Sequence, residues 1–279
     1  MTNFKSMTYD SPITLPTSRK SNLLAFARLG VFVLFSVPYA LMLYALTALK
    51  RDITALRTWY FKAMTRLVGI KVIVRGRQSD ASPQLVVANH VSYFDIFVLG
   101  GVTRGTFVAK ADIRSWPLFG WLGRSGGTIF VDRNRAATGE ARDQLRERLE
   151  AGDNLLMFPE STSNDGNRIR PFKSSLFNVA EGLSQSGKPI IVQPVSIAYT
   201  RLNGLPIGIG WRPFFAWYGD MELMPHLWKA LRLGTLTVEV TFHPAVAATA
   251  FRHRKLLAKH CEHVTGQGVA RLLSGREAA

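Results

Sequence analysis

The stretch that decides the fold is Gln84–Asp95, QLVVANHVSYFD. Its apolar first half is typical of a strand buried on both faces. The run ends at Asn89 and His90, and Asp95 follows five residues after His90. Because five residues at 100° each are poorly aligned on one helix, we expect His90 in a turn and Asp95 in the first turn of a following helix, reaching back. The stretch therefore predicts a strand, a turn and a helix.

His90 and Asp95 have two interpretations. A carboxylate that accepts a hydrogen bond from one imidazole nitrogen fixes the tautomer and makes the other nitrogen a general base. Alternatively, Ser92 and Asp95 form an S-x-x-D capping box, in which the acid only satisfies amides at the start of the helix. The residues alone leave both readings open.

Strand-like runs recur on both sides of this stretch, and the last of them, Leu236–Phe242, alternates as expected of a strand with one solvated face. Ala137–Glu150 predicts a surface helix with Leu145 and Leu149 inward. The pattern indicates an α/β domain with a mixed, largely parallel sheet flanked by helices. The expected strands are Lys71–Val74, Gln84–Ala88, Thr106–Ala109, Thr128–Val131, Asn154–Phe158, Ile190–Ile197 and Leu236–Phe242.

The N-terminal part has a different character. Leu29–Leu49 contains no charged residue and, as a helix, is about 30 Å long, which matches a hydrocarbon core. Membrane insertion is the favoured interpretation over a cleaved signal or a buried core helix. Basic residues at both ends leave open whether it spans or re-enters the bilayer, and Pro38 offers a bend. Ile53–Leu67 is amphipathic and fits either a lipid interface or a core-packing helix.

We therefore divide the chain into four segments: a flexible lead (1–22), membrane-inserting and interfacial helices (23–68), the α/β domain (69–250) and a basic C-terminal helix or tail (251–279). The chain has 279 residues, a net charge of +16 and 47% hydrophobic residues. That combination excludes intrinsic disorder. We expect no nucleic-acid partner, because no recognition module is present, and no metal, because the cluster His253–His263 lacks a zinc spacing.

Three further blocks follow the first in order. They are GTIFVDR (Gly127–Arg133), FPEST (Phe158–Thr162) and IVQPV (Ile191–Val195). Together with Asn89–Asp95, an NHxxxxD block, they resemble the glycerolipid acyltransferase family, in particular 1-acylglycerol-3-phosphate acyltransferases. Four blocks in register across about 110 residues make the resemblance specific.

The resemblance implies direct acyl transfer without a covalent intermediate. His90 would deprotonate the acceptor hydroxyl, Asp95 would orient His90, and the oxygen would attack an acyl thioester. We expect backbone amides near a helix start to bind the oxyanion. Arg133 would hold an acceptor phosphate. The expected substrate-binding residues are Gly127, Arg133, Glu160, Ser161, Thr162, Arg170, Lys173 and Pro194.

The resemblance further implies no cofactor, with acyl-CoA or an acyl carrier protein as the donor. The expected partners are membrane lipids and a lysolipid. The expected place is a bacterial-type inner membrane with the site on the cytoplasmic side. The acceptor expected first is 1-acylglycerol-3-phosphate, giving phosphatidic acid. A catalytically inactive lipid-binding protein is the alternative outside the enzyme class.

Two residues depart from the family pattern. Ser161 replaces a glycine, and Ser163 stands where many members have an arginine. Loss of a cation weakens the case for a glycerol phosphate. Phe158–Lys173 also resembles bacterial relatives that acylate lyso-ornithine lipid, which is the alternative acceptor.

Overall fold

The structure is a computed structural model that describes residues 19–116, 119–131, 139–180 and 190–275. Arg133 and parts of the lead and tail segments lie outside these ranges. The strands are β1 (Ile70–Arg75), β2 (Gln84–Ala88), β3 (Thr106–Lys110), β4 (Ile129–Val131), β5 (Leu155–Met157), β6 (Ile191–Leu202), β7 (Leu205–Pro206), β8 (Leu236–Phe242) and β9 (Val246–Ala247).

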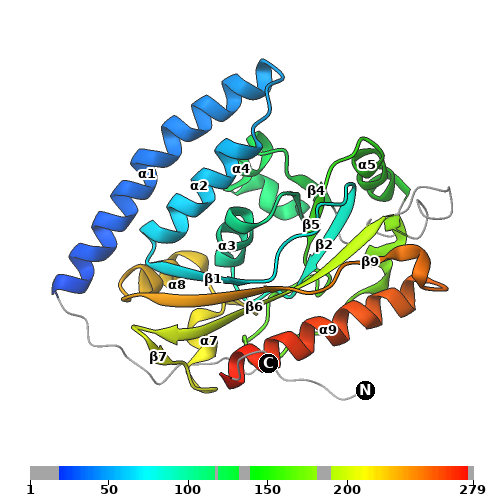
Figure 1. Ribbon diagram of the computed structural model, residues 1–279. Coiled ribbons are helices and arrows are strands. Elements are labelled where there is room, and N and C mark those ends of the chain that lie inside the picture. The colour runs from blue at the N-terminus through cyan, green and yellow to red at the C-terminus, as the bar shows by residue number, and fades with distance from the viewer. Residues whose placement is uncertain (1–18, 117–118, 132–138, 181–189, 276–279) are drawn as a thin grey trace.

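The described helices surround these strands (Figure 1). They are α1 (Arg19–Ala48), α2 (Thr54–Leu67), α3 (Phe94–Val102), α4 (Phe119–Ser125), α5 (Gly139–Glu150), α7 (Arg212–Phe215), α8 (Leu223–Leu231) and α9 (Arg254–Ser274), with short 3-10 helices η1 (Ala111–Ser115), η2 (Ser174–Phe177) and η3 (Ala248–Ala250).

Within the described ranges the strands form one mixed sheet in the order β1-β8-β6-β2-β5-β3-β4, with β7 and β9 paired to β6. The neighbours are parallel, except that β6 runs antiparallel to β7, β8 and β9. The predicted largely parallel α/β sheet is thus confirmed. Every predicted strand is present to within a few residues, and only β6 is much longer than expected.

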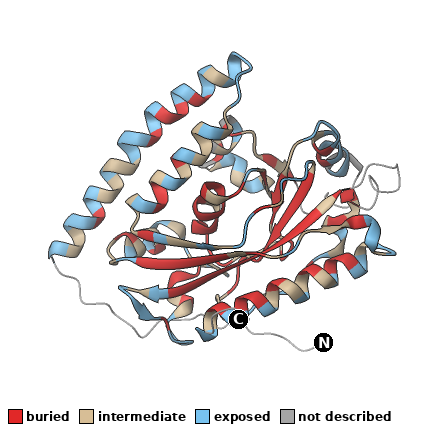
Figure 2. Cartoon of the chain, viewed as in Figure 1, coloured by how far each residue is buried: buried red, intermediate tan, exposed pale blue. Residues whose placement is uncertain are grey.

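Two hydrophobic cores cover the two faces of the sheet. Because side chains alternate along a strand, Val86 and Ala88 of β2 face the core shared with α2 and α3, while Leu85 and Val87 face the core shared with α5 and α9. The central strands are buried throughout (Figure 2). Burial on both faces explains the unbroken apolar run before His90.

The prediction of one solvated face for β8 is wrong. Thr237 and Glu239, on the polar side of the alternation, are both buried. β8 lies between β1 and β6 inside the sheet, and the carboxylate of Glu239 pairs with Arg75 at 3.1 Å. The polar positions of the alternation here include a buried carboxylate, which is paired with the partly exposed guanidinium of Arg75.

α1 continues as one helix through Pro38, and α2 runs back beside it (Figure 1). The helix is long and apolar enough to cross a membrane, and most of its side chains are exposed (Figure 2). α1 therefore suggests membrane association. α2 packs against α3 and buries Tyr60 and Met64, whereas Trp59 stays exposed, so its apolar face serves core packing.

Candidate active site

The site forms where two neighbouring parallel strands end. β2 and β5 pair directly, with Val87 opposite Met157. His90 follows β2 and Glu160 follows β5, so the carboxyl ends of the two strands bring both residues to one edge of the sheet. The two are joined by a hydrogen bond of 3.0 Å from the backbone amide of His90 to Glu160 Oε1.

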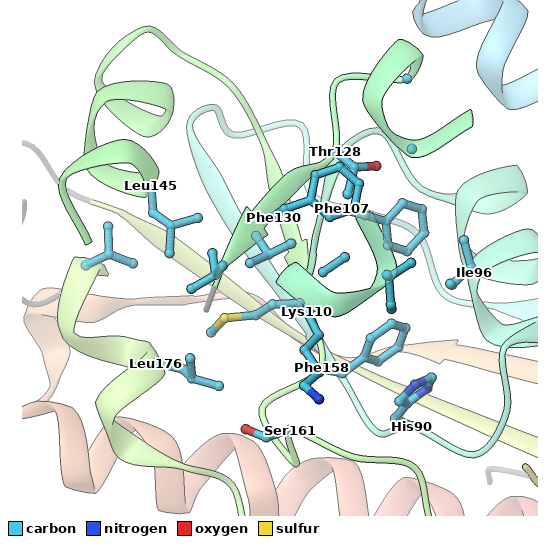
Figure 3. Close-up of a pocket in the computed structure, with 18 of the residues that line it drawn as sticks. His90, Ile96, Phe107, Lys110, Thr128, Phe130, Leu145, Phe158, Ser161 and Leu176 are labelled. Carbon is cyan, nitrogen blue, oxygen red and sulfur yellow. The ribbon is translucent and has the colours of Figure 1, made fainter. Parts of the chain in front are cut away.

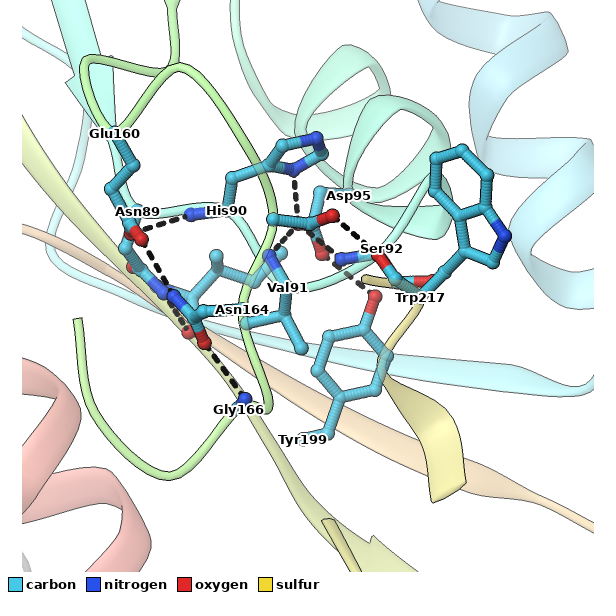
Figure 4. A network of polar contacts seen from close by, with 12 residues as sticks. Asn89, His90, Val91, Ser92, Asp95, Glu160, Asn164, Gly166, Tyr199 and Trp217 are labelled. Atoms are coloured by element: carbon cyan, nitrogen blue, oxygen red, sulfur yellow. Dashed lines mark hydrogen bonds and ion pairs between the residues drawn. The ribbon is translucent and has the colours of Figure 1, made fainter. Parts of the chain in front are cut away.

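The side chain of His90 is held by Asp95. Nδ1 of the imidazole lies 2.8 Å from Asp95 Oδ2 (Figure 4). Because a carboxylate only accepts, Nδ1 is the donor, and the lone pair of the neutral ring lies on Nε2. Asp95 is 0% exposed, whereas the imidazole is partly open to solvent. The pair is therefore arranged as an oriented base.

Asp95 also performs the capping role. Its Oδ2 accepts hydrogen bonds from the amides of Val91 (2.6 Å) and Ser92 (3.0 Å), at the start of α3. Asp95 thus contacts both the imidazole and the amides before α3, whereas no side-chain cap bond forms at the start of α3, so the predicted capping box is only half made. These two amides are committed to Asp95, so the backbone amides that we expect to bind the oxyanion are not these two.

Tyr199, which lies outside the sequence blocks, and Asn89, the first residue of the NHxxxxD block, complete the network. Tyr199, from β6, donates its hydroxyl proton to Asp95 Oδ1 at 2.7 Å. Burial, with the nearby Asp95 charge, raises the pKa of Tyr199 well above its usual value, so the hydroxyl keeps its proton. Asn89 exchanges two hydrogen bonds with the backbone of Ile197 and fixes the end of β2 to β6. Nothing in the sequence indicated that Tyr199, a tyrosine inside an apolar strand, would contact Asp95.

Glu160 lies inside its loop, away from the pocket. Oε1 accepts from the amide of His90, and Oε2 accepts from the side chain of Asn164 (2.6 Å) and the amide of Arg170 (3.0 Å). Burial raises the pKa of Glu160 to about 7, although these three donors favour the charged form. The carboxylate fastens the 160–170 loop onto the His90 turn.

The two departures from the family pattern have distinct structural outcomes. Ser161 has φ +63°, in the left-handed region that favours glycine, so the turn requires positive φ and the serine is strained. Ser163 is buried, and its hydroxyl donates to the carbonyl of Trp217. The Ser163 side chain therefore points into the protein, and this position supplies no positive charge to a ligand.

The other predicted substrate-binding residues are spread more widely. Gly127 takes φ +75° in the turn before β4. Arg170 and Lys173 are exposed, and Thr162 is half-buried beside Ser161. Pro194 lies inside β6 opposite Val87, so it is a strand residue. In the described ranges, no three His, Cys, Asp or Glu side chains gather as metal ligands.

A mainly apolar pocket opens beside His90 (Figure 3). The His90 ring stacks on Phe158 with centroids 4.1 Å apart, and Phe107 stacks behind Phe158. Ser161 also lines the pocket. Other lining residues come from α2, α3, β3, β4, α5 and η2, and include Phe61, Ile96, Phe130, Leu145, Leu176 and Val179. Such a pocket suits a fatty acyl chain.

Three basic side chains line this pocket without having been predicted as site residues: Arg57, Lys110 and Arg142. Arg57 donates to the carbonyls of Gly126 (3.0 Å) and Gly105 (2.9 Å) and shares the pocket wall with Tyr39 and Tyr60. Lys110, at the end of β3, pairs with Asp112 and points into the pocket in Figure 3. Because an arginine on an amphipathic helix is ordinarily solvated, the sequence of α2 did not indicate that Arg57 would line a pocket.

An imidazole held by a buried carboxylate beside an apolar pocket is an arrangement that can activate a hydroxyl next to a hydrocarbon chain. The acyltransferase family model matches residues 58–198. The chain therefore belongs to the acyltransferase family, and the resemblance seen in the four blocks is confirmed.

The relatives agree with this assignment. The chain is 40% identical over 225 residues to a lyso-ornithine lipid O-acyltransferase of Brucella abortus, covering 80% of this chain and 84% of that protein. It is 34% identical over 178 residues to a 1-acyl-sn-glycerol-3-phosphate acyltransferase of Neisseria gonorrhoeae, covering 63% and 64%.

A crystal structure of the 1-acyl-sn-glycerophosphate acyltransferase of Thermotoga maritima has the same fold. The TM-score is 0.66 at 22% identity, and the match covers 93% of this chain and 98% of that one.

Proposed function

We propose that this protein is a membrane-bound O-acyltransferase that moves a fatty acyl group from an acyl thioester to the free hydroxyl of a lyso-ornithine lipid. The observation that carries the proposal is the His90–Asp95 pair at the wall of the apolar pocket. The hydrogen bond to Asp95 holds Nε2 as the free nitrogen, and the pocket accommodates the acyl chain beside it.

The chemistry follows from this geometry. Nε2 of His90 removes the hydroxyl proton as the oxygen attacks the thioester carbonyl. Asp95 balances the positive charge that develops on the imidazole. Collapse of the tetrahedral intermediate breaks the C–S bond, and the imidazolium returns its proton to the departing thiolate. The products are an ester and a free thiol on CoA or an acyl carrier protein.

Two observations favour a lyso-ornithine acceptor over 1-acylglycerol-3-phosphate. The relative that shares 40% identity is named for the former substrate, and the relative at 34% is named for the latter. Ser163 is buried where many members of the family place an arginine. An acceptor without a phosphate needs no guanidinium at that point. These observations reverse the order in which the sequence alone ranked the two acceptors.

The remaining roles belong to the same proposal. Arg133, outside the described residues, would bind the acceptor head group, and the exposed Arg170 and Lys173 would add positive charge. Glu160 and Thr162 would shape the loop beside the acceptor. The long apolar helix α1 supports a place on the membrane, and we propose the inner membrane of a bacterial cell with the site on the cytoplasmic side.

The direct test is an acceptor comparison. Purified protein is incubated with one labelled acyl thioester and either lyso-ornithine lipid or 1-acylglycerol-3-phosphate. We expect faster acylation of lyso-ornithine lipid. Preference for 1-acylglycerol-3-phosphate would refute the acceptor assignment. No product from either acceptor, with a folded protein, would favour a lipid-binding protein without activity.

A further inference from the structure

We propose that the loop Asn203–Trp211 is a second lipid-contacting element, which lies in the bilayer interface together with α1. The loop reads NGLPIGIGW and contains no charged residue. It connects β6 to α7, far from α1 in the sequence. Uncharged apolar loops of this kind are uncommon on a water-facing surface, where polar turn residues prevail.

The large side chains of this loop point outward. Leu205 is 73% exposed and Ile209 is 70% exposed, values similar to the 68% of Leu34 on α1. Trp211 follows them and is also exposed. Each such side chain left in water forgoes about 1.5–3 kcal/mol of burial, so a partner that covers them is favoured.

The outward direction is built into the loop. Between Leu205 and Ile209, the side chain of Ile207 is buried in the core, and its amide donates to the carbonyl of Thr200 at 2.8 Å. The β7 pairing with β6 and the hydrogen bond from the Trp211 amide to Gly208 hold the two ends. Because the buried Ile207 fixes the middle of the loop, the side chains of Leu205 and Ile209 on either side of it are held facing outward.

The base of the loop and α1 meet at the segment that follows α8, where the amide of Asn203 donates to the carbonyl of Thr235 at 2.7 Å. Phe26 of α1 contacts Trp228 of α8, with ring centroids 4.8 Å apart. Arg28 of α1 donates to the carbonyls of Leu231 (3.0 Å) and Leu233 (2.7 Å), at the end of α8. α8 adds the exposed Met224. In Figure 2 the lower end of α1 and the exposed β7 region both lie at the left of the molecule.

The composition of the loop ends favours a bilayer over a protein partner. Arg201, just before the loop, is exposed and can meet anionic lipid headgroups. Trp211 at the other end is the residue type enriched at the membrane interface. Because α1 already suggests membrane association, and Arg28 of α1 and Asn203 of the loop both bond to the 233–235 segment, a lipid surface that reaches this end of α1 has the loop within reach.

The loop also leads directly to the candidate active site. The amide of Trp217, six residues after the loop, donates to the carbonyl of Val91 at 3.0 Å, and its carbonyl accepts from Ser163. Arg212 donates to Asn167 at 3.2 Å. Lipid contact at the loop therefore places the acceptor side of the site at the membrane surface.

Site-directed fluorescence tests the inference. The single native cysteine, Cys261, is 0% exposed and burial raises its pKa to about 12, so a thiol probe reacts only with an introduced cysteine. Ile209→Cys and Leu205→Cys report on the loop, and Leu34→Cys reports on α1. Gln144→Cys on the exposed side of α5 is the matched control. Each variant carries an environment-sensitive dye.

The full-length protein is reconstituted in phosphatidylethanolamine and phosphatidylglycerol vesicles with nitroxide-labelled acyl chains. We expect at least twofold quenching of the dye at positions 209, 205 and 34, and little at 144. Quenching at 34 alone, with iodide quenching at 209 and 205, would overturn the proposal. So would a loop signal that depends on protein concentration instead of lipid, because it would indicate a second copy of the chain. None of these readouts requires acyl transfer.

Discussion

Two buried carboxylates, Asp95 and Glu160, meet the same residue from opposite sides. Asp95 in the first turn of α3 bonds the imidazole of His90, and Glu160 after β5 bonds its backbone amide. Each accepts several N–H donors. They differ in that only Asp95 contacts the ring that would carry the proton.

Under the proposed function, Asp95 positions the base itself, and Glu160 positions the backbone around it. A substitution at Asp95 changes the tautomer and orientation of the base, whereas a substitution at Glu160 changes how the loop is fastened to the turn. The two sites should therefore respond differently in rate, in pH dependence and in stability.

The largest effect is expected for His90→Ala. Loss of the general base should lower kcat for acyl transfer by about 10²–10⁴-fold. The rate is measured with a labelled thioester and the preferred acceptor. Membrane association and thermal unfolding should stay unchanged, and an unchanged rate would remove His90 from the mechanism.

Asp95→Asn should come next. An amide in place of the carboxylate can donate to Nδ1 and stabilise the wrong tautomer, so kcat should fall by about 10²-fold or more. Initial rates at saturating substrate measure it. A loss confined to KM would instead assign Asp95 to ground-state binding.

Glu160→Gln should act mainly on stability, in a pH-dependent way. Burial raises the folded-state pKa of Glu160 from 4.5 to about 7, so the folded wild type binds this proton more tightly than the unfolded chain. The wild type should therefore lose stability, relative to the variant, as pH rises from about 4.5 to 7, by roughly 3 kcal/mol in total. Unfolding in detergent at pH 5 and pH 8 measures the difference. A pH-independent difference would contradict the raised pKa.

Tyr199→Phe tests the hydrogen bond that the Tyr199 hydroxyl donates to Asp95 Oδ1. Without its 2.7 Å hydrogen bond, the carboxylate interacts more strongly with the protonated imidazole. The acid limb of kcat/KM against pH should move to higher pH, with about a tenfold loss or less at neutral pH. A uniform loss at every pH would indicate a packing defect only.

Ser161→Gly should have the smallest effect. Relief of the left-handed conformation at φ +63° should stabilise the protein by about 1 kcal/mol or less, a rise in Tm of a few degrees. Differential scanning calorimetry measures it. A lower Tm would show that the hydroxyl contributes more than the strain costs.

The sequence predicted the strands and helices better than the contacts between elements that are far apart in the chain. Strand runs such as Gln84–Ala88 were recovered because burial on both faces leaves a continuous apolar signal. His90 and Asp95 were recovered because they are close in sequence. Tyr199 and Arg57 depend on contacts between elements far apart in the chain, which composition and spacing do not encode. Glu239 misled the prediction because its partner, Arg75, lies on another strand.

The most direct test of the account is a double-mutant cycle between His90→Ala and Asp95→Asn, measured as kcat for acyl transfer. If Asp95 acts through the imidazole, the double variant should be about as active as His90→Ala alone. If Asp95→Asn causes the same fold loss with and without His90, the two residues act independently, and the oriented-base account is contradicted.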